Sequence, residues 1–366
     1  MPQVVVLGDV NVDFIAHLPF YPQPGGESVA RRTYLCSGGS AANTALVLAR
    51  CGVQVGLMAR VGCDALAAKT LMELTNAGVD ARQIQYDSEL VTGMIFVAVT
   101  PDGERTMFSY RGANARLEPA LLQPAEIACA SVLHVSGYAL LESPQRDAAL
   151  QALDIARQAG LKVSLDVGIE AAQSLKNEVR NLLPVVDWIL PNELEAKSLM
   201  GYADRVDVAR TMEWFLSYGL EAIVLKLGER GCVVGTPEGI LSIPAFDVRV
   251  RDTTGAGDSF NAGFIAGRLG GLSWGACGLL ANALGGLAAS VDGAGASLPG
   301  PMDVIRLLDR RGGEGRWQVW QEEVRAVRTF LGQLTSGGCA RTGAQPFFSQ
   351  ALFSRLFSWQ GGDLDG

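Results

Sequence analysis

Apolar and polar positions follow two different periods along this chain. From about residue 130 onward, short runs of Val, Ile and Leu alternate with longer segments whose apolar residues recur at helical spacing. The short runs predict strands at residues 131–136, 161–166, 187–190 and 222–226, after a first strand at 4–7. The longer segments predict helices, among them 143–159 and 206–218. This alternation is typical of βαβ units, so we expect a large α/β domain with a parallel sheet.

The N-terminal third has a different pattern. Residues 10–18, 92–100 and 104–110 read as antiparallel strands, and Pro101-Asp102-Gly103 between the last two is a strong turn signal. A further strand-like run covers 246–250. We therefore expect a small β-sheet that projects from the α/β domain.

The C-terminal segment, residues 310–366, departs from the βαβ pattern. A glycine-rich break at 311–315 precedes apolar residues at helical spacing between Trp317 and Leu334, and a second apolar run covers 347–359. We expect an appended helical extension that packs on the main domain, residues 1–309, or on a second subunit, with a poorly fixed tail as the alternative. No chemistry is assigned to it.

Composition narrows the class of protein. The 366 residues carry a formal charge of −8, which disfavours nucleic acid or an anionic membrane as the main partner. Seven cysteines without a CxxC pair indicate neither a disulfide framework nor a zinc site. The N-terminus lacks a basic segment of the kind a signal peptide has, and no apolar stretch is long enough for a membrane helix. We expect a cytoplasmic protein.

Candidate chemistry concentrates at residues 252–260, DTTGAGDSF. A helical pattern at 262–269 follows, so the glycines fall at the start of a helix. Unpaired amides and the positive end of the helix dipole make such a start an anion site, and glycine lets a phosphate approach the backbone closely. Asp258 in the first turn would accept a proton from an attacking hydroxyl. An ordinary glycine-rich turn remains the alternative.

The full string resembles the C-terminal signature of the ribokinase-like carbohydrate kinases, the PfkB family. That resemblance implies a three-layer α/β/α domain with a mostly parallel sheet and a small β-sheet lid, formed here by about 10–35 and 92–112. It implies an ATP-dependent kinase that uses Mg²⁺. Asp258 would be the catalytic base, and the amides of Gly255, Ala256 and Gly257 would form the anion hole for the transferred phosphoryl group.

Two further segments, GDVNVD at 8–13 and SGGSAANTA at 37–45, resemble the family's sugar-binding segments. By that resemblance the sugar would be held by Asp13, Gly38, Gly39 and Asn43. The run RGANA at 111–115 resembles members that act on ribose, fructose and related sugars, so Asn114 is a candidate sugar contact. Arg111 would meet a carboxylate or a phosphate, or else form a surface ion pair.

The nucleotide side is implied by three weaker matches. PNELE at 191–195 resembles the family's NxxE motif, in which Asn192 and Glu195 reach phosphate and magnesium through water, and it also fits a helix cap. KLGERG at 226–231 resembles a loop over ATP, with Gly228 and Gly231 carrying the match and Lys226 a candidate phosphate contact. Asn282 falls where relatives approach the adenine.

A possible monovalent-cation site is also implied by the resemblance. Several relatives bind K⁺ in a loop that aligns here with Asp252, Thr254, Ala288, Val291, Gly293 and Ser297. Backbone and hydroxyl oxygens suit that ion. Not every member of the family uses it.

Other catalytic signals fail. The chain has no P-loop and no GxGxxG, and two histidines support neither a zinc site nor a Ser-His-Asp triad. A GxSxG match at 271–275 lies between helical segments, so Ser273 is better interpreted as a helix cap.

We therefore predict a kinase that transfers the γ-phosphate of ATP to a hydroxyl of a small sugar. Ribose, fructose, 2-keto-3-deoxygluconate and a sugar phosphate stay open. The alternatives are a nucleoside kinase and an inactive sugar-binding regulator. Because lids of this kind often pair, we expect a homodimer.

Overall fold

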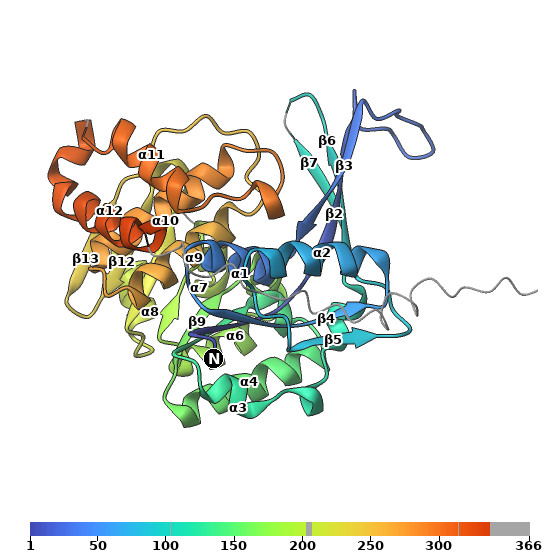
Figure 1. The fold of residues 1–366 in the computed structure, drawn as a ribbon, viewed down its shortest axis with the longest axis horizontal. Helices are drawn as coiled ribbons and strands as arrows, with labels where there is room; N and C mark the ends of the chain where they lie inside the picture. The colour runs from blue at the N-terminus through green and yellow to red at the C-terminus, as the bar shows by residue number, and fades with distance from the viewer. Residues whose placement is uncertain (103, 203–206, 314, 337–366) are drawn as a thin grey trace, which may run out of the picture.

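A large sheet forms the centre of the molecule (Figure 1). The computed structural model describes residues 1–336 except 103, 203–206 and 314. Within that part of the chain the sheet has nine strands in the order β13-β12-β11-β10-β9-β8-β1-β4-β5, parallel except for the β11–β12 and β12–β13 pairs. The strands are β1 (Val4–Leu7), β4 (Val55–Gly62), β5 (Ile84–Asp87), β8 (Val132–Ser136), β9 (Lys162–Asp166), β10 (Trp188–Ile189), β11 (Ala222–Lys226), β12 (Cys232–Thr236) and β13 (Gly239–Ile243).

Helices cover both faces of this sheet, so the fold is a three-layer α/β/α arrangement. One face carries α1 (Ser40–Arg50), α2 (Ala65–Asn76), α9 (Ala256–Leu269), α10 (Trp274–Ala289), α11 (Pro301–Arg311) and α12 (Gln321–Ser336). The other carries α3 (Pro124–Ala128), α4 (Gln145–Ala159), α5 (Ile169–Ser174), α6 (Lys176–Leu182), α7 (Glu193–Met200) and α8 (Val208–Leu216). Alternate residues of β1 pack into the two cores, which is why its sequence is apolar throughout.

Short 3₁₀ turns connect several of these elements. They are η1 (Gly112–Arg116), η2 (Pro119–Leu121), η3 (Gly137–Leu140), η4 (Leu183–Val185), η5 (Gly228–Arg230), η6 (Gly295–Ser297) and η7 (Gly315–Trp320). The predicted strands at 4–7, 131–136, 161–166, 187–190 and 222–226 are confirmed as β1, β8, β9, β10 and β11. The helix predicted at 143–159 is α4, and the one predicted at 206–218 is α8, although residue 206 lies outside the described residues.

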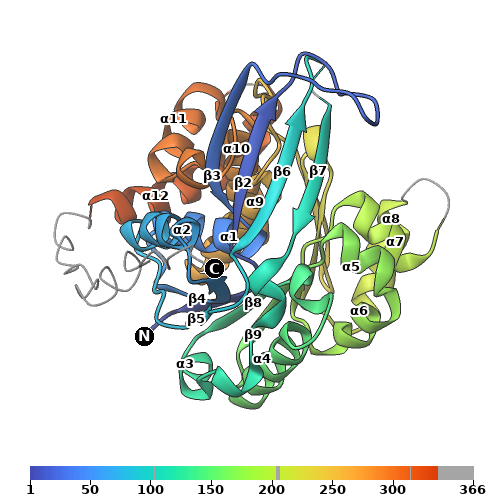
Figure 2. The same cartoon turned by 90° about the vertical axis from the view of Figure 1, so that its right-hand side faces the viewer.

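A second, four-stranded sheet projects from the body (Figures 1 and 2). Its order is β3-β2-β6-β7, from β2 (Asn11–His17), β3 (Arg32–Gly38), β6 (Gly93–Val99) and β7 (Arg105–Tyr110). The antiparallel expectation is right for the β6–β7 hairpin and wrong for β2 against β6, which pair in parallel. Because α1, β4, α2 and β5 lie between β2 and β6, no short turn forces the chain to reverse direction there.

The strand expected at 246–250 is not formed. In the described part of the chain, residues 246–250 pair with no strand, and the sheet ends at β13. Their apolar pattern arises from packing instead: Phe246 stacks on Trp317 with ring centroids 4.0 Å apart, and Val248 lies against Gly286 of α10. No helix of the described residues has the length and apolar character needed to cross a membrane.

Helix α12 packs on the main domain. Trp317, Val324, Val327 and Leu331 are buried in the same core as α9, α10 and α11. The predicted helical stripe therefore faces the body of this chain, and the apolar run at 347–359 lies outside the described residues.

Truncating that stripe should destabilise the whole domain. Leu331→Ala removes a fully buried side chain, and we expect the free energy of unfolding to fall by about 2–5 kcal/mol in a denaturant titration. Val319→Ala is the matched control, because Val319 is 84% exposed, and its effect should stay within about 0.5 kcal/mol. Equal stability of the two variants would show that α12 does not contribute to the core.

Candidate active site

The start of α9 builds the centre of the site. Gly255 is its N-cap residue and adopts φ +75°, a conformation that favours glycine, so the helix begins at Ala256, among the glycines as the sequence predicted. Gly257 and Asp258 consequently lie in the first turn, where backbone amides have no partner within the helix. The first-turn aspartate expected from the sequence is therefore in place. The anion site at 255–257 stays a prediction, and Ala256 N also donates to the carbonyl of Thr253 at 3.2 Å.

The Asp258 carboxylate is held by a second helix start. Ser40 Oγ donates to its Oδ1 at 2.8 Å and Asn43 Nδ2 donates to its Oδ2 at 2.8 Å, both from the first turn of α1. Burial, followed by the negative charge of Asp166, raises the pKa of Asp258 to about 6 against the opposing hydrogen bonds from Asn43 and Ser40. A carboxylate with such a pKa is ionised at neutral pH and basic enough to accept a proton.

Asp13 and the 38–39 turn lie beside that carboxylate. Asp13 is buried on β2, and its Oδ1 has no hydrogen-bond partner. A Cβ at Gly38 would collide with the Asp13 carboxylate, and one at Gly39, where φ is +94°, would collide with the carbonyl of Asp9. Burial, then the charges of Asp258 and Asp252, raises the pKa of Asp13 to about 7. The unpartnered oxygen is an open acceptor for a ligand hydroxyl.

A buried ion pair forms the floor of the site. Lys226 Nζ donates to Asp166 Oδ1 at 2.8 Å and to Asn261 Oδ1 at 3.3 Å, and it would lie 3.8 Å from a Cβ placed on Gly257. Burial alone would lower the pKa of Lys226, but Asp166 and Glu195 raise it, so the ammonium stays charged. Sequence reasoning missed Asp166, although its place at the carboxyl end of β9 is where ligands bind in such sheets.

The 192–195 segment lies next to Lys226. Lys226 N donates to the carbonyl of Pro191 at 2.8 Å, which brings the start of α7 to this edge of the sheet. Asn192 and Glu195 form a reciprocal capping box, with Asn192 Oδ1 accepting from Glu195 N at 2.9 Å and Glu195 Oε2 accepting from Asn192 N at 2.8 Å. Burial raises the pKa of Glu195 to about 7 even though Lys226 opposes the shift.

The other nucleotide-side residues are placed less directly. Gly228 begins η5 and Gly231 follows it, with φ values of +60° and +92°, and a Cβ at Gly231 would collide with the carbonyl of Ile243. Asn282 lies on α10, where its Nδ2 donates to the carbonyls of Ile243 at 3.1 Å and Pro244 at 3.0 Å. Through these two hydrogen bonds Asn282 connects the end of β13 to α10.

Arg111 and Asn114 interact with protein groups. Arg111 pairs with Asp9 at 3.2 Å and with Glu142 at 3.1 Å, so its charge is already balanced. Asn114 is fully buried; its Oδ1 accepts from Val10 N at 2.9 Å, and its Nδ2 donates to the carbonyl of Val10 and to Asn11. These contacts hold the start of β2, and thus Asp13, in place.

The loop expected to bind K⁺ is assembled around Asp252. Asp252 Oδ2 accepts from Gly293 N at 3.0 Å, Asp252 N donates to the carbonyl of Ala289 at 3.3 Å, and Thr254 caps the other oxygen. The remaining candidates nearby in the chain are Ala288 at the end of α10, Val291 just after it and Ser297 in η6. An arginine that sequence reasoning missed, Arg105 of β7, ion-pairs with Asp252 Oδ1 at 2.6 Å.

Charges in the site fit a nucleotide with a divalent cation. Lys226 is one cation that faces three carboxylates, Asp166, Glu195 and Asp258. The pKa values of Glu195 and Asp258 are raised mainly by burial and, to a lesser extent, by the charge of Asp166. Carboxylate oxygens are suitable ligands for Mg²⁺, which keeps several waters and binds mainly through phosphates. Among the described residues no three acidic, histidine or cysteine side chains gather to hold a metal alone. Any such ion would depend on phosphate and water for its remaining ligands.

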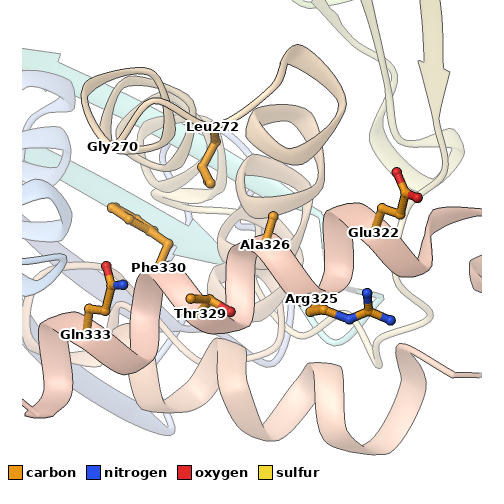
Figure 3. A pocket seen from close by; sticks show the side chains of 8 residues that line it. All are labelled: Gly270, Leu272, Glu322, Arg325, Ala326, Thr329, Phe330 and Gln333. Atoms are coloured by element: carbon orange, nitrogen blue, oxygen red, sulfur yellow. The ribbon is translucent and has the colours of Figure 1, made fainter.

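A surface pocket elsewhere has none of this chemistry. Figure 3 shows it between α12 and the end of α9, lined by Gly270, Leu272, Glu322, Arg325, Ala326, Thr329, Phe330 and Gln333. Gly270 lies twelve positions after Asp258 along α9, about 18 Å at 1.5 Å per residue. The pocket therefore does not belong to the site around Asp258.

Comparisons with known proteins agree with this geometry. The chain is 30% identical over 310 residues to the ribokinase of Haemophilus influenzae, a match that covers 84% of this chain and 98% of the relative. It is 30% identical to fructokinase-2 of Solanum lycopersicum over 70% of this chain and 79% of the relative. A structure described as a putative ribokinase II of E. coli in complex with ATP and Mg²⁺ has a TM-score of 0.76 at 24% identity, covering 85% of this chain and all of that one.

The family model gives the same assignment and confirms the expectation from the motifs. A model described as pfkB family carbohydrate kinase matches residues 1–301. The matched region contains both sheets and every candidate residue named above. The chain therefore belongs to the pfkB family of carbohydrate kinases, enzymes that transfer a phosphoryl group to a hydroxyl.

Proposed function

We propose that this protein transfers the γ-phosphoryl group of ATP to a hydroxyl of a small neutral sugar, with Asp258 as the base. The observation that carries the proposal is the position of Asp258: in the first turn of α9, hydrogen-bonded by Ser40 and Asn43, near Asp13 and near Lys226. A proton acceptor that lies near a candidate sugar residue, Asp13, and near a candidate phosphate residue, Lys226, supports this proposal. Its intact environment favours a catalyst over a sugar-binding regulator without activity.

In the proposed reaction the sugar binds against Asp13, Gly38, Gly39 and Asn43. The hydroxyl gives its proton to Asp258 as its oxygen forms a bond to the γ-phosphorus, and the bond to the β,γ-bridging oxygen breaks to release ADP. The amides of residues 255–257 stabilise the negative charge on the transferred group.

Lys226 would balance the negative charge of the ATP phosphates. The 192–195 and 228–231 segments would line the nucleotide side of the site. Asn192 and Glu195 would hold Mg²⁺ through water. When bound, this ion supplies positive charge to the phosphate oxygens. The small sheet would act as a lid over the sugar and limit hydrolysis of ATP by water.

The charges of the sugar side favour a neutral substrate. Arg111, the cation considered for a carboxylate or phosphate, is already paired with Asp9 and Glu142. Asp13 and Asp258 add negative charge, so an acidic sugar would meet repulsion that a neutral one avoids. We therefore propose ribose, fructose or a similar neutral sugar ahead of 2-keto-3-deoxygluconate, a sugar phosphate or a nucleoside.

The experiment that tests this assignment is ADP release by the purified protein across a panel of acceptors. We expect ADP formation that depends on a neutral sugar, with a kcat/KM at least about tenfold higher than for the matching sugar acid or sugar phosphate, about 1.4 kcal/mol of discrimination. A nucleoside or an acidic sugar as the best acceptor would overturn the substrate class. Sugar binding without ADP release would favour the regulator.

Activity should fall in acid because the base must be ionised. With its pKa raised to about 6, Asp258 is protonated below that pH, so kcat/KM for the sugar should decline as pH falls through about 6. Ser40→Ala removes a hydrogen bond that lowers this pKa, and we expect the acid limb to move to higher pH. If Ser40→Ala does not move the acid side of the kcat/KM profile, a group other than Asp258 is responsible for the decline.

The outer face of the small sheet supports a homodimer. Leu35, Phe14, Phe96 and Phe108 lie in one cross-strand row on the face opposite Asp13, and all four are exposed. Phe14 and Phe96 stack with ring centroids 5.4 Å apart. A continuous exposed apolar row of this kind is typical of an interface, and we propose a second copy of the chain as its partner.

Sedimentation of wild type and variants tests that pairing. Wild type should sediment as a dimer and Phe96→Asp as a monomer, because the substitution would bury a charge in the proposed interface. Leu121→Asp, at an exposed site on the body, should leave the mass unchanged. A wild-type monomer, or a Phe96→Asp dimer, would contradict the proposal.

A further inference from the structure

A guanidinium group lies inside the loop that leads into α9. Arg105 Nη1 donates to Asp252 Oδ1 at 2.6 Å and to Thr254 Oγ1 at 2.7 Å, while its Nη2 donates to Thr253 Oγ1. Arg105 belongs to β7 of the small sheet, 147 residues before Asp252 in the chain. One side chain therefore binds all three residues that precede the Gly255 N-cap.

This contact is more shielded than the Arg32–Asp292 ion pair, which also joins the small sheet to this region. The side chains of Arg105 and Asp252 are 25% and 14% exposed and lie 2.6 Å apart. Arg32 and Asp292 are 63% and 44% exposed and lie 4.0 Å apart. Pairs at the surface contribute little, whereas a partly buried pair with several hydrogen bonds defines a geometry.

The carboxylate of Asp252 accepts hydrogen bonds at both oxygens. Its Oδ1 accepts from Thr254 N at 2.9 Å, Thr254 Oγ1 at 2.7 Å and Arg105, and its Oδ2 accepts from Gly293 N. Burial would raise the pKa of Asp252, but the bonds from Thr254 and Gly293 and the charge of Arg105 lower it, so the group is an anion.

These contacts do not fit a K⁺ ion at the same place. A cation bound by these side chains would need oxygen atoms with free lone pairs, and Asp252 Oδ1 and Thr254 Oγ1 already accept hydrogen bonds from Arg105. The ion would also meet the permanent positive charge of a guanidinium at short range. The loop therefore already has the positive charge that a monovalent cation would bring.

We propose that Arg105 takes the place of a monovalent cation, fixing residues 252–254 and through them the phosphate-binding amides at 255–257, so that the kinase needs no K⁺. The proposal rests on the proposed role of the start of α9. Arg105 is a positioning residue, since it acts through the loop. Because it comes from β7, the loop is complete only when the small sheet lies against the body.

The test is sugar-dependent ADP release in K⁺ and in tetramethylammonium at equal ionic strength. For wild type we expect kcat in the two salts to agree within about twofold. Arg105→Ala should lower kcat in tetramethylammonium by about tenfold to 100-fold, the range for a small displacement of a phosphate site. For Arg105→Ala, kcat should be at least about threefold higher in K⁺ than in tetramethylammonium, because K⁺ can enter the space that the arginine leaves. Arg105→Lys should retain more activity than Arg105→Ala.

Arg32→Ala is the matched control, because it removes an arginine of the same sheet that contacts the same region. It should behave as wild type in both salts. Arg105→Ala should melt within about 4 °C of wild type, so that lost turnover does not reflect unfolding.

Wild-type turnover that rises tenfold with K⁺ would overturn the proposal, and so would a folded Arg105→Ala enzyme with unchanged kcat or with a loss that K⁺ does not reduce. Failure of the base assignment is a separate result, because it would appear as activity in Asp258→Asn whatever the salt.

Discussion

Asp258→Asn is expected to lower sugar phosphorylation by about 10²–10⁴-fold while ATP still binds. Asparagine has the shape of aspartate and keeps an oxygen for the hydrogen bonds from Ser40 or Asn43, but it has no lone pair basic enough to take the hydroxyl proton. The backbone amides of 255–257 and Lys226 are unchanged, so the phosphate site remains. The measurement is kcat from ADP release, together with the dissociation constant of ATP by calorimetry.

Asp247→Asn is the control for that variant. Asp247 is an exposed carboxylate that pairs with Arg316 at 2.9 Å. Its kcat should match wild type. Asp258→Asn with more than about a tenth of wild-type turnover would show that another group accepts the proton, since general-base catalysis contributes at least about 10²-fold.

Lys226→Met should produce the largest loss of stability among substitutions at the site. It leaves the Asp166 carboxylate buried without its 2.8 Å partner, and the free energy of unfolding should fall by about 3–5 kcal/mol. The double variant with Asp166→Asn should recover part of that loss, because no uncompensated charge remains. Denaturant titration of the single and double variants measures both effects.

Lys162→Met supplies the comparison. Lys162 also contacts two carboxylates at 2.8 Å, Asp187 and Glu221, but its side chain is 49% exposed. Solvent screens that pair, so its loss should cost no more than about 1 kcal/mol. If the two lysine variants are equally stable, the Asp166–Lys226 pair is not the buried support that the structure indicates.

Local sequence patterns predicted the parts of the fold that depend on short-range periodicity. The apolar runs of β8, β9, β10 and β11 and the helical stripe of α12 were all visible, because each buries a regular set of side chains. The parallel pairing of β2 with β6 was not, since it depends on a crossover of several elements rather than on the strands themselves. The run at 246–250 was wrongly predicted as a strand because its alternating apolar residues pack on other elements, Phe246 on Trp317 and Val248 on α10.

The candidate site divides in the same way. Asp258 and the 255–257 turn were predictable because their chemistry lies in one short segment whose helix start the structure confirms. Asp166 was missed because its partner Lys226 is 60 residues away in the chain. Arg105 was missed because it lies in the small sheet, 147 residues before the loop residue Asp252 that it contacts. The pairing of Arg111 with Asp9 and Glu142 likewise depends on three separate elements.

A single turnover with ATP labelled at the γ-phosphate tests the central claim most directly. With enzyme in excess over labelled ATP and a neutral sugar present, we predict that the label moves to the sugar in wild type and stays in ATP with Asp258→Asn over the same period. Sugar phosphate formed at equal rates by the two proteins would contradict the role of Asp258. Label released only as inorganic phosphate would contradict the transfer itself.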